Sequence, residues 1–378
     1  MPKLSEVPRP SKLQQILILG RDHWDHDGYD PDSRRAFRLA FQCETPALGG
    51  RVFASENEEG VFYNTCKSPA CPSCGHWSTI QWQRQRFCAL PEGPYLGITF
   101  TMPNTLWPLF AHSPRLCRKL PEIAAHIIGS YARVRYGVEV GVMAVLHTFN
   151  GELRFNSHVH ALVTAGGLQT SGSGWRPRIF FVRDELMRSW QRLVIALLRG
   201  ASDAGQFDLG GQFDLEIGRA ELEDLLHQEE KRGWIVHVQA FHGKEHFLRY
   251  AGRYVRRPPI AQWRILAIAD GFVRFWCKDR RHHRWVVVQC TIEEFIDRWS
   301  QHIPKRYRHA VRHFGLFAPR RWTQVAAAIF ANLGTKQRQR PKRLPWAIAI
   351  QAQFGRNPQL DKNGQPMKFA RHLAPVAI

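Results

Sequence analysis

The sequence predicts an α+β fold, with a cysteine-rich region ahead of it and a basic region behind it. Apolar, β-branched runs around residues 95–102 and 141–164 have the composition of strands, whereas residues 182–200 have the periodicity of an amphipathic helix. The cysteines cluster near the N-terminus, and no acidic residue occurs between Asp297 and Asp361. These features predict three parts along the chain.

The first part is expected to be helical and then to form a hairpin. Residues 10–42 contain two helix-like segments, and alternating apolar residues around 52–54 and 61–63 indicate a short β-hairpin. A cysteine knuckle follows the hairpin. The segment WSTIQWQRQR at 77–86 then predicts a basic helix.

The middle part mixes strands and helices. The strands are expected at 95–102, 141–149, 153–166 and 233–241, and the helices at 121–136, at 182–200 and from 245 onward. The prolines at 258 and 259 are expected to end the last of these helices. Further strands are expected at 272–277 and 285–290, followed by a helix that Thr291 caps. We place the domain boundaries so that the three parts are 1–93, 94–265 and 266–378.

The composition indicates a folded protein with a polyanionic partner. The chain has 378 residues and carries 53 Lys and Arg against 32 Asp and Glu, a formal charge of +21. Nucleic acid is the usual partner of such a surface. The 13 tryptophans argue against a basic tail. No apolar run approaches the ~18 residues that span a bilayer, and the first residues lack a signal-peptide pattern, so a cytoplasmic location is expected.

The cysteine spacing predicts a zinc site. Cys66, Cys71 and Cys74 form a C-x4-C-x2-C knuckle, in which Pro72 and Gly75 favour a tight turn. Zinc takes about four soft ligands, so a fourth must come from elsewhere in the chain. Cys43 is the preferred fourth ligand, with His76 and Cys88 as alternatives. Three unrelated buried thiols are the structural alternative to a metal site.

Histidines suggest a second metal site in the predicted strands. His158 and His160 are two residues apart, so both side chains point to one face of a strand. His147 lies on the preceding strand and can join them across the hairpin. Nitrogen ligands with open positions suit a divalent ion such as magnesium or manganese over a phosphate. Histidines on a strand can also be structural.

The segment EHFLRYAGRYVRRPP carries two tyrosines that invite a catalytic interpretation. Tyr250 and Tyr254 are one helical turn apart, where aromatic side chains often simply pack together. A phenol oxygen can also attack phosphorus and form a covalent phosphotyrosine. The neighbouring arginines could bind the DNA backbone phosphates. These arginines are Arg249, Arg253, Arg256 and Arg257.

Two other classes of function fit part of this pattern. A non-catalytic zinc-knuckle protein that binds nucleic acid would share the charge and the cysteines. A metal-dependent nuclease that uses water would share the histidines but needs a carboxylate base, for which Glu152 is the only nearby candidate. Neither class explains why the histidines occur together with arginine-flanked tyrosines.

The motifs resemble those of the HUH endonuclease superfamily, and in detail its two-tyrosine transposases, which move insertion sequences by a rolling-circle route. The similar segments include NTCKSPACPSCG, VLHTFNGELRFNSHVHALVTAGG and YAGRYVRRPPIAQWRI, and they occur in the family's order from about Cys43 to Arg320. The resemblance implies a ferredoxin-like antiparallel catalytic sheet with flanking helices, an N-terminal zinc-binding domain and a bacterial source.

The resemblance also implies roles for individual residues. It gives His158 and His160 as metal ligands, Tyr250 and Tyr254 as nucleophiles, and single-stranded DNA at the element's ends, together with target DNA, as the partner. The cleaved strand would be held as a 5′-phosphotyrosine. Many relatives carry a further C-x-x-C in the hairpin, where this chain reads ASENEEG. One structural zinc on four cysteines is therefore expected rather than two.

Overall fold

The centre of the molecule is a five-stranded antiparallel sheet. The computed structural model describes residues 9–172, 174–205, 218–255, 258–279, 282–306 and 311–376. Within them the sheet has the strand order β13-β5-β6-β3-β9. Its strands are β3 (Tyr95–Phe100), β5 (Gly141–Phe149), β6 (Phe155–Thr164), β9 (Val236–Phe241) and β13 (Val311–Gly315).

The topology of this sheet is ferredoxin-like, as the resemblance implied. The chain runs from β3 through helices to β5, turns directly into β6, and returns through helices to β9. This is a β-α-β-β-α-β unit whose four strands lie in the order β9-β3-β6-β5. Strand β13, from much later in the chain, is added antiparallel beside β5.

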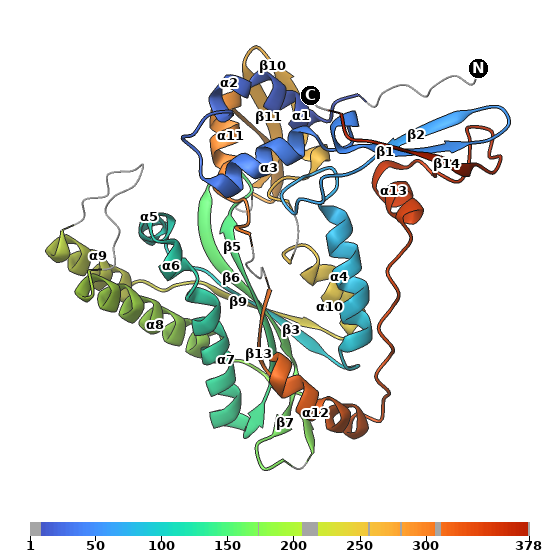
Figure 1. Ribbon diagram of the computed structural model, residues 1–378. Helices are drawn as coiled ribbons and strands as arrows, with labels where there is room; N and C mark the ends of the chain where they lie inside the picture. The colour runs from blue at the N-terminus through green and yellow to red at the C-terminus, as the bar shows by residue number, and fades with distance from the viewer. Residues whose placement is uncertain are drawn as a thin grey trace.

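Two long helices cover one face of the sheet. The residues that alternate along β3 toward this face are Leu96, Ile98 and Phe100, and they are buried in one core with α7 (Leu120–Tyr136) and α8 (Arg183–Asp203). Helix α9 (Arg219–Lys231) packs outside α8 (Figure 1). The expected helices at 121–136 and 182–200 are confirmed.

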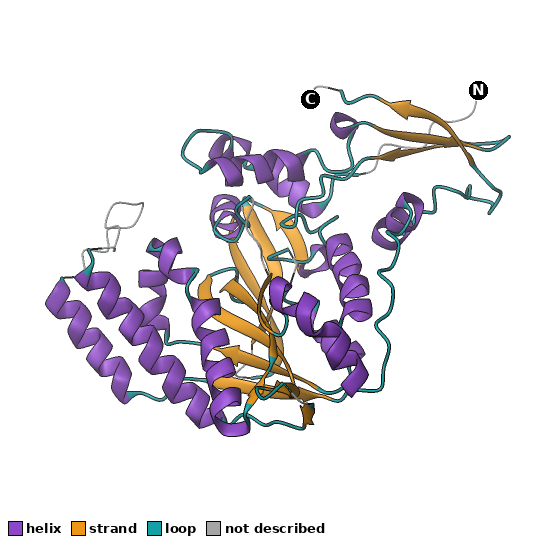
Figure 2. Cartoon of the chain, turned by 60° about the horizontal axis from the view of Figure 1, so that its bottom comes forward, coloured by secondary structure: helices purple, strands orange, loops and turns teal. Residues whose placement is uncertain are grey.

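Other helices lie against the opposite face of the sheet. Helix α4 (His76–Ala89) and helix α10 (Lys244–Ala251) lie side by side there, on the far side of the sheet from α7 and α8 (Figure 2). Tyr95, Val145 and Leu162 of the sheet share a core with buried residues of α10. This second face carries the histidines described below.

The N-terminal helices pack on a second, three-stranded sheet. Helices α1 (Lys12–Leu19) and α3 (Pro31–Phe41) share a core with α11 (Ile292–Ser300) and with the sheet β10-β11-β12. The strands of this sheet are β10 (Ile265–Ala269), β11 (Phe272–Asp279) and β12 (Arg284–Thr291). Ser11 and Gln14 form a capping box at the start of α1, and Thr291 caps α11 as expected.

The expected hairpin is present and gains a third strand from the C-terminal region. Strands β1 (Gly50–Ala54) and β2 (Glu59–Tyr63) pair, and β14 (Lys368–Leu373) pairs with the free side of β1. Trp346, the first residue of α13 (Trp346–Phe354), stacks on Phe53 of β1 with ring centroids 5.9 Å apart. The three-domain division at residues 93 and 265 stays a prediction.

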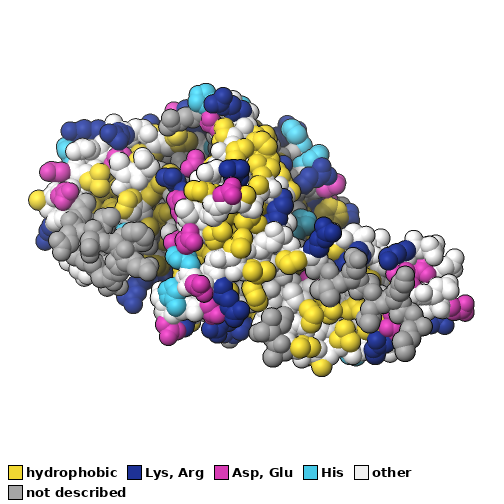
Figure 3. Space-filling view, turned by 90° about the horizontal axis from the view of Figure 1, so that it is seen from above, with side chains coloured by type: hydrophobic (Ala, Val, Ile, Leu, Met, Phe, Trp, Pro, Cys, Tyr) yellow, Lys and Arg dark blue, Asp and Glu magenta, His cyan; other side chains and the backbone are white. Residues whose placement is uncertain are grey.

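The remaining elements are short or peripheral. They are α2 (Arg21–Trp24), α5 (Trp107–His112), α6 (Pro114–Cys117), α12 (Pro319–Asn332), β4 (Val138–Glu139), β7 (Gly166–Gln169), β8 (Trp175–Pro177) and the 3-10 turns Pro46–Leu48, Asn104–Leu106 and Gln262–Arg264. Among the described residues, no helix combines the length and apolar character that crossing a bilayer requires. Figure 3 looks down on the end of the molecule that carries α1 to α3 and shows a hydrophobic strip with Lys and Arg side chains beside it.

Candidate active site and zinc centre

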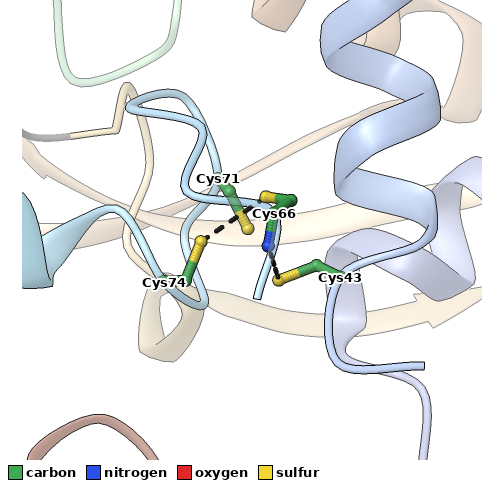
Figure 4. A group of neighbouring side chains, drawn as sticks. All are labelled: Cys43, Cys66, Cys71 and Cys74. Atoms are coloured by element: carbon green, nitrogen blue, oxygen red, sulfur yellow. Dashed lines mark hydrogen bonds between the residues drawn. The ribbon is translucent and has the colours of Figure 1, made fainter. Parts of the chain in front are cut away.

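Four cysteines meet between the end of α3 and the start of α4. The sulfur atoms of Cys43, Cys66, Cys71 and Cys74 all lie within 4.8 Å of one another and face a common centre (Figure 4). The sulfurs of Cys66 and Cys74 are 3.5 Å apart. The structure thus brings Cys43 to the knuckle, and it is Cys43, rather than the alternatives His76 and Cys88, that completes this group.

The donor set fits zinc. Four thiolates in a tetrahedron with bonds of ~2.3 Å place their sulfurs about 3.8 Å apart, close to the spacing of this cluster. Hydrogen bonds from Cys43, and then from Cys66 and Cys74, lower the pKa of the Cys71 thiol well below its usual value, while hydrogen bonds within the same group raise the pKa of Cys43. Thiolate is the form that binds metal. The four sulfur donors and their spacing therefore fit a tetrahedral zinc ion.

The knuckle is tightly wound because glycine follows its last cysteine. A Cβ atom on Gly75 would lie 2.7 Å from the carbonyl oxygen of Cys71. The Gly75 N–H donates to that same oxygen at 2.8 Å, which closes the turn directly before α4. The Cys66 N–H lies 3.5 Å from the Cys43 sulfur, a contact typical of thiolate ligands. The fold of the knuckle thus fixes the first residue of α4.

Helix α4 connects the zinc centre to the helix that carries Tyr250. Gln83 of α4 donates its side-chain amide to the carbonyl oxygen of Leu248 in α10 at 2.9 Å. A Cβ on Gly252 would come within 2.3 Å of that amide nitrogen, so the two helices are in close contact. The buried Lys244 at the start of α10 pairs with Glu92 at 2.6 Å, just beyond α4. The two helices are thereby joined near both ends.

Three histidines converge on the α10 face of the central sheet. One ring nitrogen from each of His147, His158 and His160 lies within 4.8 Å of the others. The strand register explains this, because His147 of β5 lies directly opposite His158 of β6. His147 and His160 are buried, whereas His158 is half-buried.

Hydrogen bonds fix the tautomer of two of these imidazoles. His158 donates from Nδ1 to the carbonyl oxygen of Asn156 at 2.8 Å, so Nε2 keeps its lone pair. His147 donates from Nε2 to the carbonyl oxygen of Tyr254 at 2.6 Å, so Nδ1 keeps its lone pair. Burial lowers the pKa of His147 to about 4, which keeps it in the neutral form that binds metals. The nitrogen donors fit a divalent ion.

Tyr254 lies against this histidine cluster, and Tyr250 lies beside Tyr254. The Tyr254 ring stacks on the His160 imidazole, with centroids 3.7 Å apart and planes at 25°. The Tyr250 ring lies 4.9 Å from the Tyr254 ring. Both side chains are half-buried. The structure therefore gathers the tyrosines and the histidines in one place.

Helix α10 ends earlier than expected. It stops at Ala251 rather than at the prolines, so Tyr250 is helical whereas Tyr254 lies in the turn that follows. The chain tightens there, because the Tyr254 N–H donates to Ala251 at 2.9 Å in a three-residue turn. The close contact of Gly252 with Gln83 accompanies this change. The turn brings Tyr254 over His160.

Two residues that the sequence analysis missed complete the site. Thr99 of β3 pairs with His160 in the sheet register, and its hydroxyl lies 3.1 Å from His160 Nδ1. The same hydroxyl also bonds to Tyr250. Gly97, two residues earlier on the same face, makes room for the Tyr250 ring, which would lie 3.0 Å from a Cβ there. Neither residue is marked by a motif, so only the strand register reveals them.

The environment of Tyr250 disfavours its ionised form. Burial, followed by the neighbouring Tyr254, raises the pKa of Tyr250 to about 12, while the hydrogen bond from Thr99 and the charge of Arg253 oppose this rise. Arg253 is exposed, and Arg249 is exposed and pairs with Glu245 at 3.4 Å. Arg256 and Arg257, the other two expected phosphate-binding residues, lie outside the described residues.

Comparison with known proteins gives consistent matches. A family described as a putative transposase matches residues 141–324, and one described as a transposase zinc-binding domain matches residues 19–102. The protein named transposase for insertion sequence element IS801, from Pseudomonas savastanoi pv. phaseolicola, is 32% identical over 338 residues, which cover 86% of this chain and 80% of that protein. No solved structure matched the chain.

A second relative agrees with the first. The protein named putative transposase y4qJ, from Sinorhizobium fredii, is 30% identical over 321 residues, which cover 82% of this chain and 80% of that protein. The cysteine cluster lies within the span of the zinc-binding match, and the histidines and tyrosines lie within the other. The chain belongs to this family of transposases with an N-terminal zinc-binding domain.

Proposed function

We propose that this protein is a DNA transposase that cleaves and rejoins single-stranded DNA through a covalent bond to tyrosine. One observation carries the proposal. The ring of Tyr254 stacks on His160, and its backbone oxygen accepts a hydrogen bond from His147. A phenol that only packs in a core does not need two candidate metal ligands as its neighbours.

The reaction that we propose is an in-line displacement at phosphorus. The phenol oxygen of a tyrosine attacks the scissile phosphate and forms an O–P bond, while the bond from phosphorus to the 3′-oxygen breaks. The phenol proton is lost, and the leaving 3′-oxygen gains a proton. The products are a 5′-phosphotyrosine and a free 3′-hydroxyl. Attack by a 3′-hydroxyl on the phosphotyrosine rejoins DNA by the reverse steps.

The histidines would hold the divalent ion that the reaction uses. His147, His158 and His160 are the ligands that we assign, and magnesium or manganese is the ion class. When bound, such an ion neutralises charge on the phosphate and so favours attack. Thr99 fixes the orientation of His160 and donates a hydrogen bond toward the Tyr250 oxygen, which opposes the rise of its pKa.

Two tyrosines allow two strand ends to be held in succession. The Tyr250 and Tyr254 rings are 4.9 Å apart, so both can reach the same phosphate-binding region. Arg253 and Arg249 are exposed beside them and suit the phosphates of the bound strand. We infer that the strands are the ends of the mobile element and its target.

The zinc centre has a structural role in this proposal. It anchors the start of α4, a helix rich in glutamine and arginine, and α4 in turn contacts α10. Phosphate contacts from such a helix would position DNA without reading its sequence. The zinc region would therefore dock DNA and hold the tyrosine helix in place at the same time.

One assay separates this proposal from its alternatives. The protein is incubated with a labelled single-stranded oligonucleotide from the element's end and with magnesium or manganese, and then run on a denaturing gel. The proposal predicts a labelled protein band that survives denaturation. Cleavage without such a band indicates a nuclease that uses water, and binding without cleavage indicates a non-catalytic binder.

Controls connect the band to the site. The band should disappear with EDTA and with a duplex of the same sequence. Digestion of the adduct and mass spectrometry should place the nucleotide on a peptide that contains Tyr250 or Tyr254. An adduct on any other peptide contradicts the assignment of the nucleophiles.

A further inference from the structure

The sheet β10-β11-β12 has one buried face and one exposed face. Val273, Phe275 and Cys290 of the buried face lie in the core shared with α1 and α11. The exposed face carries Trp276 and Trp285 among its polar residues, and Trp263 of the preceding 3-10 turn lies beside them, whereas a solvated sheet face normally shows mostly polar residues. We call it the tryptophan face and define it by Trp263, Arg274, Trp276, Lys278, Trp285 and Val287.

Two of the three tryptophans on this face are open to solvent, and Trp276 is half-buried. Trp263 is 61% exposed and Trp285 is 49% exposed, and their rings meet edge to face with centroids 5.5 Å apart. Val287, also 49% exposed, lies opposite Trp276 in the strand register. Large side chains gathered in the open mark an interaction site more often than chance exposure.

Positive charge alternates with these rings. Arg274 and Lys278 flank Trp276 along β11 on the same face, and both are exposed. Lys278 lies directly opposite Trp285. The only acidic residue of β11 and β12, Asp279, pairs with His282 at 2.7 Å. Protein-binding patches are depleted of lysine at their centre, whereas rings between cations suit a nucleic acid strand.

The tryptophan face is also joined to the hairpin that carries His147 and His158. Arg264, next to Trp263, donates to the carbonyl oxygen of Gly151 and to that of Trp276. Gly151 lies in the turn between β5 and β6, the strands that carry His147 and His158. His302, just after α11, donates to Leu153 of the same turn at 2.9 Å. The face therefore lies beside the end of the hairpin that holds the histidines.

We propose that the tryptophan face binds a segment of single-stranded DNA that extends from the cleavage site. Bases stack on Trp263 and Trp285, and backbone phosphates pair with Arg274 and Lys278. This inference rests on the proposed function, because it gives the single strand that is cleaved at the tyrosines a second binding site on the protein.

The chemistry selects single strands over duplex. Stacking on tryptophan requires the face of a base, which base stacking hides inside a duplex. A duplex could reach only the cations of the face. The tryptophans should therefore contribute to the binding of single strands and contribute little to the binding of duplex DNA.

The test compares two double variants in the full-length protein. One replaces Trp263 and Trp285 with alanine, and the other replaces both with phenylalanine, which keeps a ring for stacking. Phe180→Ala is the matched control, because Phe180 is 67% exposed but lies on the segment that leads into α8. Fluorescence anisotropy measures binding of an oligothymidylate of about 30 nucleotides, longer than the ~4–16 that one stacking domain covers.

We expect the alanine variant to bind the oligothymidylate about tenfold more weakly or worse, and the phenylalanine variant to recover part of that loss. Binding of a duplex of equal length should stay unchanged, as should the circular dichroism melting curve. Equal binding by the alanine variant and the wild type overturns the inference. An equal loss of duplex binding in the alanine variant also overturns the inference, because the tryptophans would then not act by stacking on bases. A wild-type dimer that the alanine variant cannot form overturns it too, because the face would then bind a second copy of the chain.

The adduct assay distinguishes this inference from the proposed function. A short oligonucleotide that covers only the cleavage site should form the covalent adduct equally well with the wild type and with the alanine variant. If the wild type forms adducts but the tryptophans do not matter for binding, only the inference fails. If the tryptophans matter for binding but the wild type forms no adduct, only the proposed chemistry fails.

Discussion

Tyr254 lies flat against His160, with ring centroids 3.7 Å apart, while its backbone oxygen accepts a hydrogen bond from His147. Tyr254 thus contacts His160 through its ring and His147 through its backbone oxygen. A shift of the turn after α10 would move the Tyr254 phenol and, at the same time, disturb the candidate metal ligand His147. Chemistry at Tyr254 and metal binding should therefore be coupled.

Thr99→Val should slow adduct formation without unfolding the protein. Valine keeps the shape of threonine on β3 but removes the hydroxyl that contacts His160 and Tyr250. Each lost hydrogen bond costs ~1 kcal/mol, so the loss of one or both predicts a rate about 5- to 30-fold lower. Thr101→Val is the control, since that hydroxyl bonds to the carbonyl oxygen of Ile235. Equal rates for the two variants in single-turnover assays contradict the positioning role of Thr99.

Gly97→Ala should impair Tyr250 more than Tyr254. The added methyl would lie 3.0 Å from the Tyr250 ring, a contact that the ring must move to relieve. Adducts mapped by mass spectrometry should therefore shift from the Tyr250 peptide toward the Tyr254 site. Gly129→Ala on α7 is the control, because a Cβ there meets no atom within 4 Å. An unchanged distribution of adducts refutes the packing role of Gly97.

His158→Ala should abolish cleavage and leave DNA binding intact. His158 is the half-buried member of the cluster, so its removal disturbs the core less than removal of His160. Loss of one of the three ligands should also lower manganese affinity, which isothermal titration calorimetry without DNA can measure. A variant that cleaves at the wild-type rate, or binds manganese as before, excludes the metal role of this histidine.

Cys71→Ser should remove zinc and loosen the tyrosine helix. Serine is a poor zinc ligand, so the zinc content measured by elemental analysis should fall from about one zinc per chain toward none. Because α4 starts at the knuckle and Gln83 holds Leu248, hydrogen exchange in α10 should rise more than in β6. Cys88→Ser, outside the cluster, should keep its zinc. Full zinc content in Cys71→Ser would overturn the ligand assignment.

Much of the local structure could be predicted because local patterns determine it. Four features depend on residues that are close together in the sequence. They are the knuckle, the hairpin, the amphipathic helix α8 and the cap at Thr291. The meeting of His147 with His158 could also be predicted, since a short hairpin turn fixes the strand register. Cys43 could be chosen because the knuckle lacked a fourth ligand.

The long-range pairings could not be predicted from such patterns. Strand β14 is largely exposed and shows no apolar alternation, so only its hydrogen bonds to β1 define it. Helices α1 and α3 were expected, but their packing on β10 to β12 depends on surfaces far apart in sequence. Thr99 became a candidate only when the register placed it opposite His160.

The end of α10 was predicted wrongly for a related reason. Proline at 258 and 259 marks the latest point at which the helix can end, but the close contact of Gly252 with Gln83 coincides with an earlier end. The prolines alone therefore do not set the end of the helix.

The central claim is that Tyr250 and Tyr254 are nucleophiles, and one measurement tests it most directly. The double variant Tyr250→Phe and Tyr254→Phe keeps both rings, and with them the stacking on His160, but removes both phenol oxygens. It is incubated with a single-stranded end of the element and manganese, and covalent adducts are counted on a denaturing gel. We predict wild-type folding, wild-type DNA binding and no adduct. An adduct that forms with the double variant would contradict the account and return the tyrosines to a packing role.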